Sequence, residues 1–286
     1  MYSIYKRQMS WSIGIFEGTS PFILAQTKDT ENPVISARDV SDVEAAFVAD
    51  PFMVKKNRKY FMFFEVLNLQ TYTGDIGYAV SEDGTNWQYQ KIILDETFHL
   101  SYPCIYEWEG SYYMIPESGD DLSIRLYLAK SFPEGWEYIG NLMSGEDYSD
   151  PTAFYHDNKW WMFATKKHSG SLYLFYSDNL ERGWEAHPMN PIITGNKHIA
   201  RSAGRIFSYD NKMYRLAQDD FPIYGLQVYA IEITELNETS YQESSEPISI
   251  VKMTGKDWNS EGMHHVDLHL IDNEWHAVVD GRKRWP

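Results

Sequence analysis

Asp50 to Glu65 reads DPFMVKKNRKYFMFFE: an Asp-Pro pair, a short apolar strand, a polar turn and a second strand rich in aromatic residues. The same order of features returns four more times, at a spacing of roughly 50 residues. The later copies are PCIYEWEGSYYMIPE at 103–117, DPTAFYHDNKWWMFAT at 150–165, GRIFSYDNKMYRLAQ at 204–218 and HVDLHLIDNEWHAVVD at 265–280. Five copies of a two-strand unit are typical of a β-propeller in which each copy begins one blade.

Two further strand-like segments follow most copies, which predicts four antiparallel strands per blade. After the first copy these segments are Asp75–Ser81 and Trp87–Leu94, bounded by turns that contain Gly, Asn and Asp. The fifth copy lacks them, but Ser12–Phe16 and Pro33–Ser36 near the N-terminus resemble third and fourth strands of other repeats. We therefore expect residues 1–286 to form a single all-β domain, a five-bladed β-propeller whose last blade is completed by the N-terminus, which leaves no open sheet edge between the first and last blades.

Composition limits the classes of protein that this chain can represent. Its 286 residues are 43% hydrophobic and 16% aromatic, enough for a packed core. A net charge of −16 argues against nucleic acid or an anionic membrane as the main partner, and solubility explains it simply. The single cysteine, Cys104, fits a reducing compartment. No segment is apolar enough to insert in a membrane and residues 1–10 are too polar for a signal peptide, so we expect a cytoplasmic protein of undetermined oligomeric state.

The central funnel of such a propeller would be lined by charged and polar residues, which are costly to bury unless they are paired or used. The starts of the inner strands hold Asp50, Tyr102, Asp150, Arg201, Arg205, His264, His265 and Asp267. The ends of the second strands add Glu65, Glu117, Lys166, Gln218 and Asp280, and further candidates are Asp75 and His99. Each has a structural alternative: an Asp-Pro pair can simply open a turn, and the cations can simply neutralise the acids.

Carboxylates on opposite sides of a pocket suit glycosidic chemistry, in which one acid is protonated and another is ionised. We predict that Asp50 is the general base or holds the sugar, with Glu117 and Asp267 as candidates for the acid. Cationic residues in the same funnel would bind a phosphorylated, nucleotide-activated or acidic sugar. The predicted substrate-binding set is Glu65, Asp75, His99, Tyr102, Asp150, Lys166, Arg201, Arg205, Gln218, His264, His265 and Asp280.

Metal and cofactor motifs are missing from the sequence. His-x-x-x-His zinc spacing on a helix, a cysteine cluster, a phosphate-binding glycine loop and a GxSxG elbow are all absent. We therefore expect no metal and no cofactor. A structural Ca²⁺ held by the ring of acids is a third, less favoured interpretation.

Two known groups resemble this chain. Asp50-Pro51 with its aromatic second strand resembles blade one of the family 43 glycoside hydrolases, where the matching Asp is the general base, but Tyr102-Pro103-Cys104 and Arg201-Ser202-Ala203-Gly204 stand where the other two acids would be. The arginine that stands in place of one of these acids makes the chain more similar to the propeller mannoside phosphorylases, which bind phosphate.

Over nearly its whole length, the chain resembles the propeller domain of the plant glucosamine inositolphosphorylceramide transferases and their bacterial homologues. Its landmarks are Ala49–Phe52, Gly74–Gly77, His99–Pro103, Ala200-Arg201 with Gly204-Arg205, and His264–Asp267.

Two functions of different classes follow. The first is a carbohydrate-active enzyme, similar to glycoside hydrolases, that cleaves or transfers a glycosidic bond of an anionic or phosphate-bearing sugar, with a carbohydrate or nucleotide sugar as its ligand. The second is a non-catalytic glycan-binding module that assists a glycosyltransferase. A catalytic funnel needs two carboxylates at a separation of roughly 5 to 10 Å, whereas a binding module needs only stacking rings and hydrogen bonds.

Overall fold

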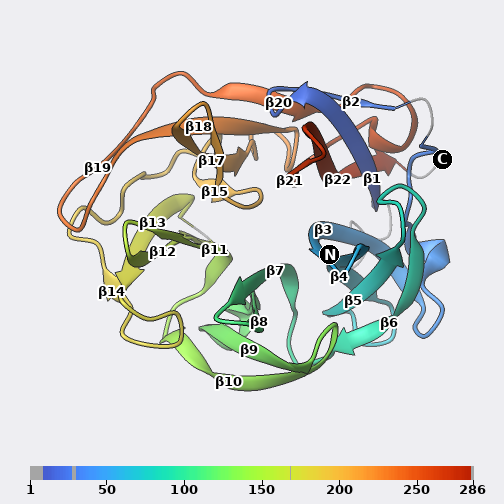
Figure 1. Cartoon of the computed structure of the whole chain (residues 1–286), viewed down its shortest axis with the longest axis horizontal. Coiled ribbons are helices and arrows are strands. Elements are labelled where there is room, and N and C mark those ends of the chain that lie inside the picture. The colour runs from blue at the N-terminus through green and yellow to red at the C-terminus, as the bar shows by residue number, and fades with distance from the viewer. Residues whose placement is uncertain (1–8, 28–29, 168, 285–286) are drawn as a thin grey trace.

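Five antiparallel sheets stand around a central axis in the computed structural model, which describes residues 9–27, 30–167 and 169–284 (Figure 1). Blade 1 contains β3 (Ala45–Lys56), β4 (Lys59–Asn68), β5 (Gly74–Ser81) and β6 (Gln88–Leu94). Blade 2 contains β7 (Ser101–Trp108), β8 (Ser111–Glu117), β9 (Ser123–Ser131) and β10 (Glu134–Ser144). Blade 3 contains β11 (Tyr148–His156), β12 (Lys159–Lys166), β13 (Ser171–Ser177) and β14 (Glu185–Ala186).

The inner strand of blade 4 is divided into β15 (Arg201–Ser202) and β16 (Phe207–Tyr209), which both pair with β17. This blade continues with β17 (Lys212–Gln218), β18 (Gln227–Leu236), β19 (Tyr241–Glu243) and β20 (Ile248–Lys252). Short 3-10 turns lie outside the sheets: η1 (Ala37–Asp39), η2 (Gly119–Asp121) and η3 (Asp257–Asn259). Within the described part of the chain, no helix is long and apolar enough to cross a membrane.

Blade 5 combines both ends of the described chain, in the order β21 (Val266–Ile271), β22 (Glu274–Arg284), β1 (Met9–Ser20) and β2 (Ile23–Gln26). In Figure 1 the blue β1 lies beside the red β22, and their register is continuous from Met9–Arg284 to Gly18–Trp275. The predicted five-bladed architecture and its closure by the N-terminus are therefore confirmed.

The prediction that Pro33–Ser36 forms the fourth strand of the last blade is wrong. A tight turn after Ser20 brings Ile23–Gln26 back along β1, so these residues form the outer strand instead. The segment Pro33–Ser36 makes only an isolated bridge to β1, between Ile35 and Ile13.

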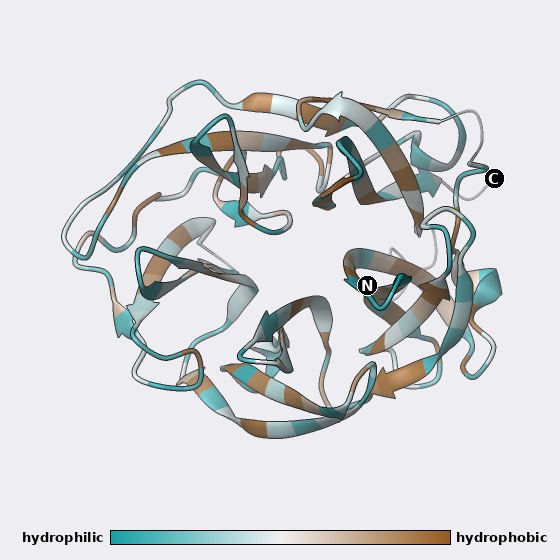
Figure 2. Cartoon of the chain, viewed as in Figure 1, coloured by the Kyte–Doolittle hydropathy of each residue, from teal (hydrophilic) through white to brown (hydrophobic). Residues whose placement is uncertain are grey.

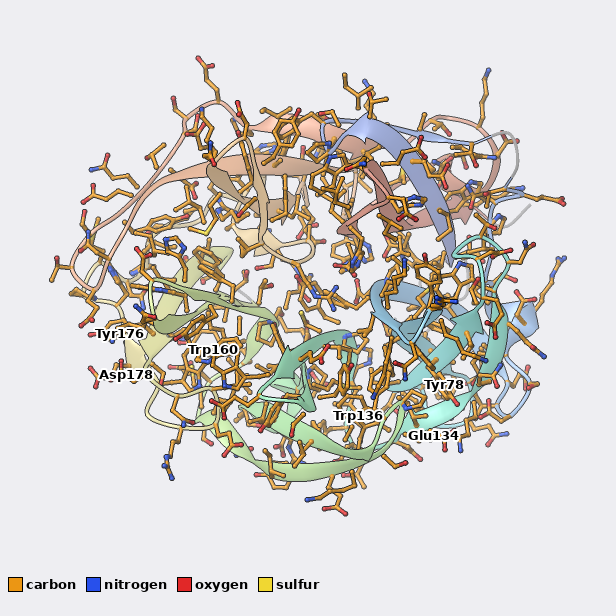
Figure 3. All side chains as sticks on the ribbon, in the orientation of Figure 1. Tyr78, Glu134, Trp136, Trp160, Tyr176 and Asp178 are labelled. Carbon is orange, nitrogen blue, oxygen red and sulfur yellow. The ribbon has the colours of Figure 1, made fainter. Side chains whose placement is uncertain are left out.

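Apolar side chains fill the spaces within and between blades. In Figure 2 the hydrophobic segments lie mostly within the strands and the loops are mostly hydrophilic. Trp136 of blade 2 is buried against Phe63 of blade 1, with ring centroids 5.9 Å apart, so this turn tryptophan packs between the two blades. Figure 3 shows Tyr78 and Glu134 meeting at the outer edge of the same junction, where the Tyr78 hydroxyl donates to Oε1 of Glu134 at 2.7 Å.

A repeated backbone bulge begins the inner strands of three blades. Asp50, Tyr102 and Asp150 each precede a proline and have φ angles of 53°, 49° and 50°. At each position the register of the inner strand against its neighbour shifts. Left-handed backbone costs on the order of 1 kcal/mol for a residue with a Cβ, so it persists only where its surroundings enforce it. The bulges occur at Asp50 and Asp150, which belong to the charged groups described below, and at Tyr102, which is almost fully buried.

Candidate functional site

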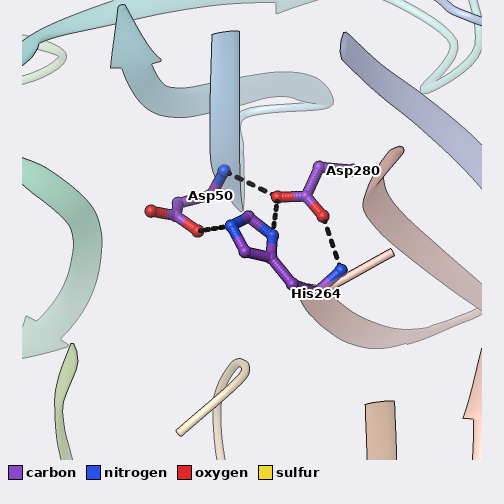
Figure 4. Close-up of side chains that lie close together, drawn as sticks. All are labelled: Asp50, His264 and Asp280. Carbon is purple, nitrogen blue, oxygen red and sulfur yellow. Dashed lines mark hydrogen bonds and ion pairs between the residues drawn. The ribbon is translucent and has the colours of Figure 1, made fainter. Parts of the chain in front are cut away.

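Asp50 lies at the mouth of the channel, and Figure 4 shows its side chain beside those of His264 and Asp280. Its Oδ1 is 3.8 Å from Nε2 of His264 and 3.8 Å from Nδ1 of His265. Nδ1 of His264 forms an ion pair with Oδ2 of Asp280 at 2.6 Å. Asp280 also accepts the backbone N–H of Asp50 at 3.1 Å and those of both histidines at 3.0 Å. Asp280 therefore fixes the positions of Asp50 and of the two rings around it.

The charges in this group favour proton transfer at Asp50. Burial raises the pKa of Asp50 to about 6, while His264 opposes the rise and Asp280 adds to it. Burial alone would lower the pKa of His264, but Asp280 reverses this effect and raises it above its ordinary value. The side chain of Asp50 is 12% exposed, whereas that of Asp280 is fully buried. An accessible carboxyl that titrates near neutrality can both accept and donate a proton at working pH.

Aromatic rings hold His264 in place. Trp11 of β1 stacks on the imidazole with ring centroids 4.0 Å apart, and Tyr224 contacts it edge-on at 5.2 Å. The guanidinium of Arg282 lies 5.3 Å from the centroid of the Trp11 ring. The N-terminal strand thus supplies part of the site, because Trp11 reaches the channel only when β1 pairs with β22.

A second group of charges lies across the mouth, between blades 2, 3 and 4. Arg201 Nε is 2.5 Å from Oδ2 of Asp150, and its Nη2 is 3.7 Å from Oε2 of Glu117. Lys167 Nζ is 3.5 Å from the other Glu117 oxygen, and Gln218 donates to Oδ2 of Asp150 at 3.1 Å. Burial would raise the pKa of Glu117, but Arg201 and Lys167 hold it below its ordinary value. An ionised Glu117 is suited to binding cations and not to donating a proton.

The acids at the ends of the second strands share a structural task that the sequence did not reveal. Glu117 at the end of β8 accepts the backbone N–H of Asp150 at 3.3 Å, as Asp280 in β22 accepts that of Asp50. In both cases a carboxylate of one blade satisfies the bulge of the next. Because a buried N–H without a partner is costly, these acids support the strained backbone at each inner-strand start.

Asp267 and Arg205 form a buried pair in the channel wall. The guanidinium of Arg205 contacts Oδ2 of Asp267, which also accepts the Met53 N–H and lies 2.8 Å from Nε2 of His269. Burial would raise the pKa of Asp267, but Arg205 holds it below its ordinary value. The side chain of Asp267 is fully buried, so the structure places this predicted catalytic acid behind the funnel surface.

Tyr102 and His265 fill the channel next to this pair. Their rings pack edge-on at 5.3 Å, and both residues are at most 1% exposed. The Tyr102 hydroxyl accepts the Gly204 N–H and lies 2.8 Å from Oγ1 of Thr152. The channel is therefore closed by side chains at this level.

A pocket of about 290 Å³ opens beside Asp150 at the mouth. Its walls carry the cations Lys167, Lys197 and Arg201, the acid Asp220, and Tyr224. Tyr224 links this pocket to the Asp50 group, because the same ring contacts His264. The lining of the pocket therefore holds more cations than acids, although Arg201 and Lys167 also pair with Asp150 and Glu117 beside it. Such a lining can contact an anionic group.

The remaining predicted residues lie elsewhere. Glu65 and His99 pair with each other, with Oε1 and Nε2 3.4 Å apart. Asp75 is buried in β5 and accepts from Asn68 at 3.0 Å. Lys166 is not among the residues that line the pocket, because its Nζ lies 2.5 Å from Glu146.

Sequence reasoning missed three residues that the structure brings to the mouth, Lys197, Tyr224 and Trp11, and of the neighbouring pair Lys166-Lys167 it selected the residue that lies outside the pocket. Lys167, Lys197 and Tyr224 lie on loops, and Trp11 lies on β1. For Tyr224, the available signal was a loop reading FPIYG directly after the end of a second strand.

One group of described residues is arranged so that it could hold a metal ion: Asp50, His264 and Asp280. One ligand atom from each of these residues lies within 4.8 Å of the other two. The donor set fits poorly, because Asp280 raises the pKa of His264 and so favours its protonated form. A metal ligand must be the neutral imidazole. Proton transfer is the better use of this group.

Comparison with known proteins places the chain in a family. Residues 5–282 match the family described as glucosamine inositolphosphorylceramide transferase 1, N-terminal. Proteins named glucosamine inositolphosphorylceramide transferase 1 from Arabidopsis thaliana and Oryza sativa subsp. japonica are 35% and 32% identical, over 95% of this chain. The alignments cover only 39% and 40% of those proteins, so the chain spans about two fifths of their length.

Solved structures of carbohydrate enzymes share the fold. A putative glycoside hydrolase from Parabacteroides distasonis has a TM-score of 0.67 at 14% identity, covering 92% of this chain and 98% of that one. The Cellvibrio cellulosa α-L-arabinanase complexed with arabinohexaose has a TM-score of 0.59 at 17% identity, covering 83% and 90%. Identities this low show the architecture alone. On the strength of the match over residues 5–282, the chain belongs to the glucosamine inositolphosphorylceramide transferase 1 N-terminal family.

Proposed function

We propose that this chain is an enzyme that transfers or cleaves a glycosidic bond of a phosphate-bearing sugar at the mouth of the propeller. Asp50 exchanges a proton with the reacting oxygen. Lys167, Lys197 and Arg201 hold the anionic group of the substrate in the adjoining pocket. The observation that carries the proposal is the contact of Tyr224, a wall of that pocket, with His264, the partner of Asp50.

Electrostatics supports an anionic substrate. The chain as a whole carries a net charge of −16, yet this pocket gathers three cations. Lys167 and Arg201 each contact Glu117, and they also pair with Asp120 and Asp150 respectively, so much of their charge is balanced. Lys197 forms no ion pair with any described residue, so its charge is the one left for an anionic ligand. The curated relatives are named for inositolphosphorylceramide, which contains a phosphate, and this agrees with the chemistry of the pocket.

The surrounding charges favour transfer over simple hydrolysis. Hydrolysis needs two protein carboxyl groups in complementary protonation states. Here Glu117 and Asp267 are held ionised by cations. Burial also raises the pKa of Asp150, but its Oδ2 is engaged by Arg201 and Gln218, so Asp50 is the partly exposed carboxyl whose pKa lies near neutrality. Transfer from a glycosyl phosphate requires less of the protein. The acceptor oxygen forms a bond to the anomeric carbon, its proton passes to Asp50, and phosphate leaves with the electron pair of the broken bond.

The pair of Asp280 and His264 supports this step without touching the substrate. Protonated His264 stabilises the ionised form of Asp50 that accepts the proton, and Asp280 keeps the ring charged and oriented. When the proton has moved to Asp50, the positive ring facilitates its release to water.

A non-catalytic glycan-binding module is the alternative. The observation that favours it is the burial of Asp267 and the neutralisation of Glu117, two of the three acids that sequence reasoning assigned to catalysis. In that case the funnel would hold a glycan for a separate transferase.

The experiment is a product screen by mass spectrometry. Wild type is incubated with glycosyl phosphates and nucleotide sugars, each with and without oligosaccharide and cyclitol acceptors, alongside Asp50→Asn, Lys167→Met and Lys166→Met. We expect turnover in wild type, its loss in Asp50→Asn, and a KM increase of about tenfold in Lys167→Met from one lost charged contact of about 1.5 kcal/mol.

Lys166→Met is the matched control, since it removes a neighbouring cation that pairs with Glu146 outside the pocket. An equal effect of the two lysine substitutions would refute the assignment of the anion pocket. Binding of sugar without any turnover, unchanged in Asp50→Asn, would support the binding module instead.

A further inference from the structure

A second groove lies on the opposite side of blade 1 from Asp50. It has a volume of about 320 Å³ and lies between residues 30–34 and the β5–β6 turn. Ser81, at the start of that turn, is in register with Tyr60, and Tyr60 is in register with Lys55 at the far end of β3. The groove shares no lining residue with the pocket at the mouth, so it is a separate site.

Trp87 forms one wall of this groove. It belongs to a series of turn tryptophans whose indole N–H donates to a carbonyl of the same turn: Trp87 to Gly84 at 3.0 Å, Trp136 to Pro133 at 2.8 Å and Trp184 to Leu180 at 3.0 Å. Trp136 is 8% exposed within the core, whereas Trp87 is only half-buried. The bonded indole is held in one position, which makes Trp87 a preorganised aromatic surface.

The polar wall of the groove is also held in place. Asp83 accepts the backbone N–H and the side-chain amide of Asn86 at 2.8 and 2.7 Å. On the other side, Asn32 is fixed by paired hydrogen bonds with the N–H and C=O of Ile15, at 2.8 and 2.9 Å. Thr30, in the same wall, is 5% exposed, and its hydroxyl has no partner among the described residues. A buried hydroxyl without a hydrogen-bond partner lowers the stability of the fold by about 1 to 3 kcal/mol. The wall of the groove therefore contains a hydrogen-bonding group that no described residue uses.

Charge distinguishes this groove from the pocket at the mouth. Its lining includes the acid Glu31 and, within the described residues, no cation. An anionic sugar is therefore disfavoured here. A half-buried indole with amide, hydroxyl and carboxylate groups around it provides stacking and hydrogen bonds for a neutral sugar ring, in a volume within the range of about 300 to 1,000 Å³ typical of small-molecule sites.

We propose that this groove binds a short stretch of neutral glycan, independently of the reaction at the mouth. The ring of one sugar unit packs on Trp87, and its hydroxyl groups bond to Asn86 and Glu31. Such a site would anchor the chain to a polysaccharide while the mouth acts on a different group.

The test is affinity electrophoresis in native gels that contain glucomannan, galactan or arabinoxylan. The proteins are wild type, Trp87→Ala, Glu31→Ala, Trp184→Ala and Asp50→Asn. Trp184→Ala removes an indole with the same hydrogen bond in another blade, and Asp50→Asn alters only the mouth. We expect at least one gel to retard wild type, Trp184→Ala and Asp50→Asn. Retardation should be lost in Trp87→Ala and weakened severalfold in Glu31→Ala.

Glu31→Ala changes an exposed side chain, so it keeps the test decisive if Trp87→Ala does not fold. No retardation of wild type in any gel would overturn the proposal. Loss of retardation in Asp50→Asn would assign binding to the mouth, and an equal loss in Trp184→Ala would show that the effect is one of folding. Each of these outcomes contradicts a glycan site at Trp87.

Discussion

Replacing Asp50 by Asn should abolish turnover and, at the same time, make the protein more stable. The pKa of Asp50 is about 6 in the folded chain, whereas an unfolded aspartate titrates near about 3.9. Because the folded-state pKa is raised, ionised Asp50 destabilises the fold. The penalty is absent below about pH 4, where both states are protonated, and complete above about pH 6, where it reaches about 3 kcal/mol.

Asparagine cannot ionise, so the variant should escape this penalty. The gain in unfolding free energy should be about 1.5 kcal/mol at pH 5 and about 3 kcal/mol at pH 8. Urea titration followed by tryptophan fluorescence at the two pH values would measure it. Asp178→Asn, at a carboxylate that is 88% exposed (Figure 3), is the control and should change stability little at either pH. A variant that is less stable than wild type at pH 8, or a gain independent of pH, would refute the placement of Asp50 in a costly environment.

Other consequences follow from the same contacts. Asp267→Asn should destabilise the protein by about 3 to 5 kcal/mol in urea titrations, because Arg205 would remain buried without its partner, and a loss below about 1 kcal/mol would contradict this. Trp11→Ala should reduce kcat by far more than it raises KM, because it releases His264 while the cations of the anion pocket keep their contacts and Tyr224 loses only an edge contact, and a pure KM effect would argue against positioning. If Asp50 accepts the proton, kcat/KM should rise with pH through about 6, as a pH–rate profile would show, and a flat profile from pH 5 to 8 would exclude that role.

The fold was predictable because its signal is repeated. The sequence holds five copies of one two-strand unit. The last copy lacks two strands and the N-terminal segment has strands to spare, which together indicate a closed ring even when no contacts are known. The outer strand of the last blade was misplaced because two short candidate segments follow β1. Its pairing was decided by the turn after Ser20, which brings Ile23–Gln26 directly back onto β1.

The site was only partly predictable, for a geometrical reason. Strand position identified the acids at the mouth, because every inner strand delivers its first residues to the same place. It could not decide between Lys166 and Lys167, since β12 ends at Lys166 and side-chain alternation no longer applies beyond it. Nor could it show that Glu117 and Asp280 accept the backbone N–H groups of Asp150 and Asp50, because those contacts join different blades.

The stacking of Trp11 on His264 ties the proposed site to the closure of the ring. β1 and β22 are the first and the last of the described strands, so β1 has no partner in its own sheet but β2 until the ring closes. Contacts this distant in sequence form late and slowly. A chain in which β22 has not yet paired with β1 would therefore lack the indole against His264. The proposed site is complete only after the two ends of the described chain have come together.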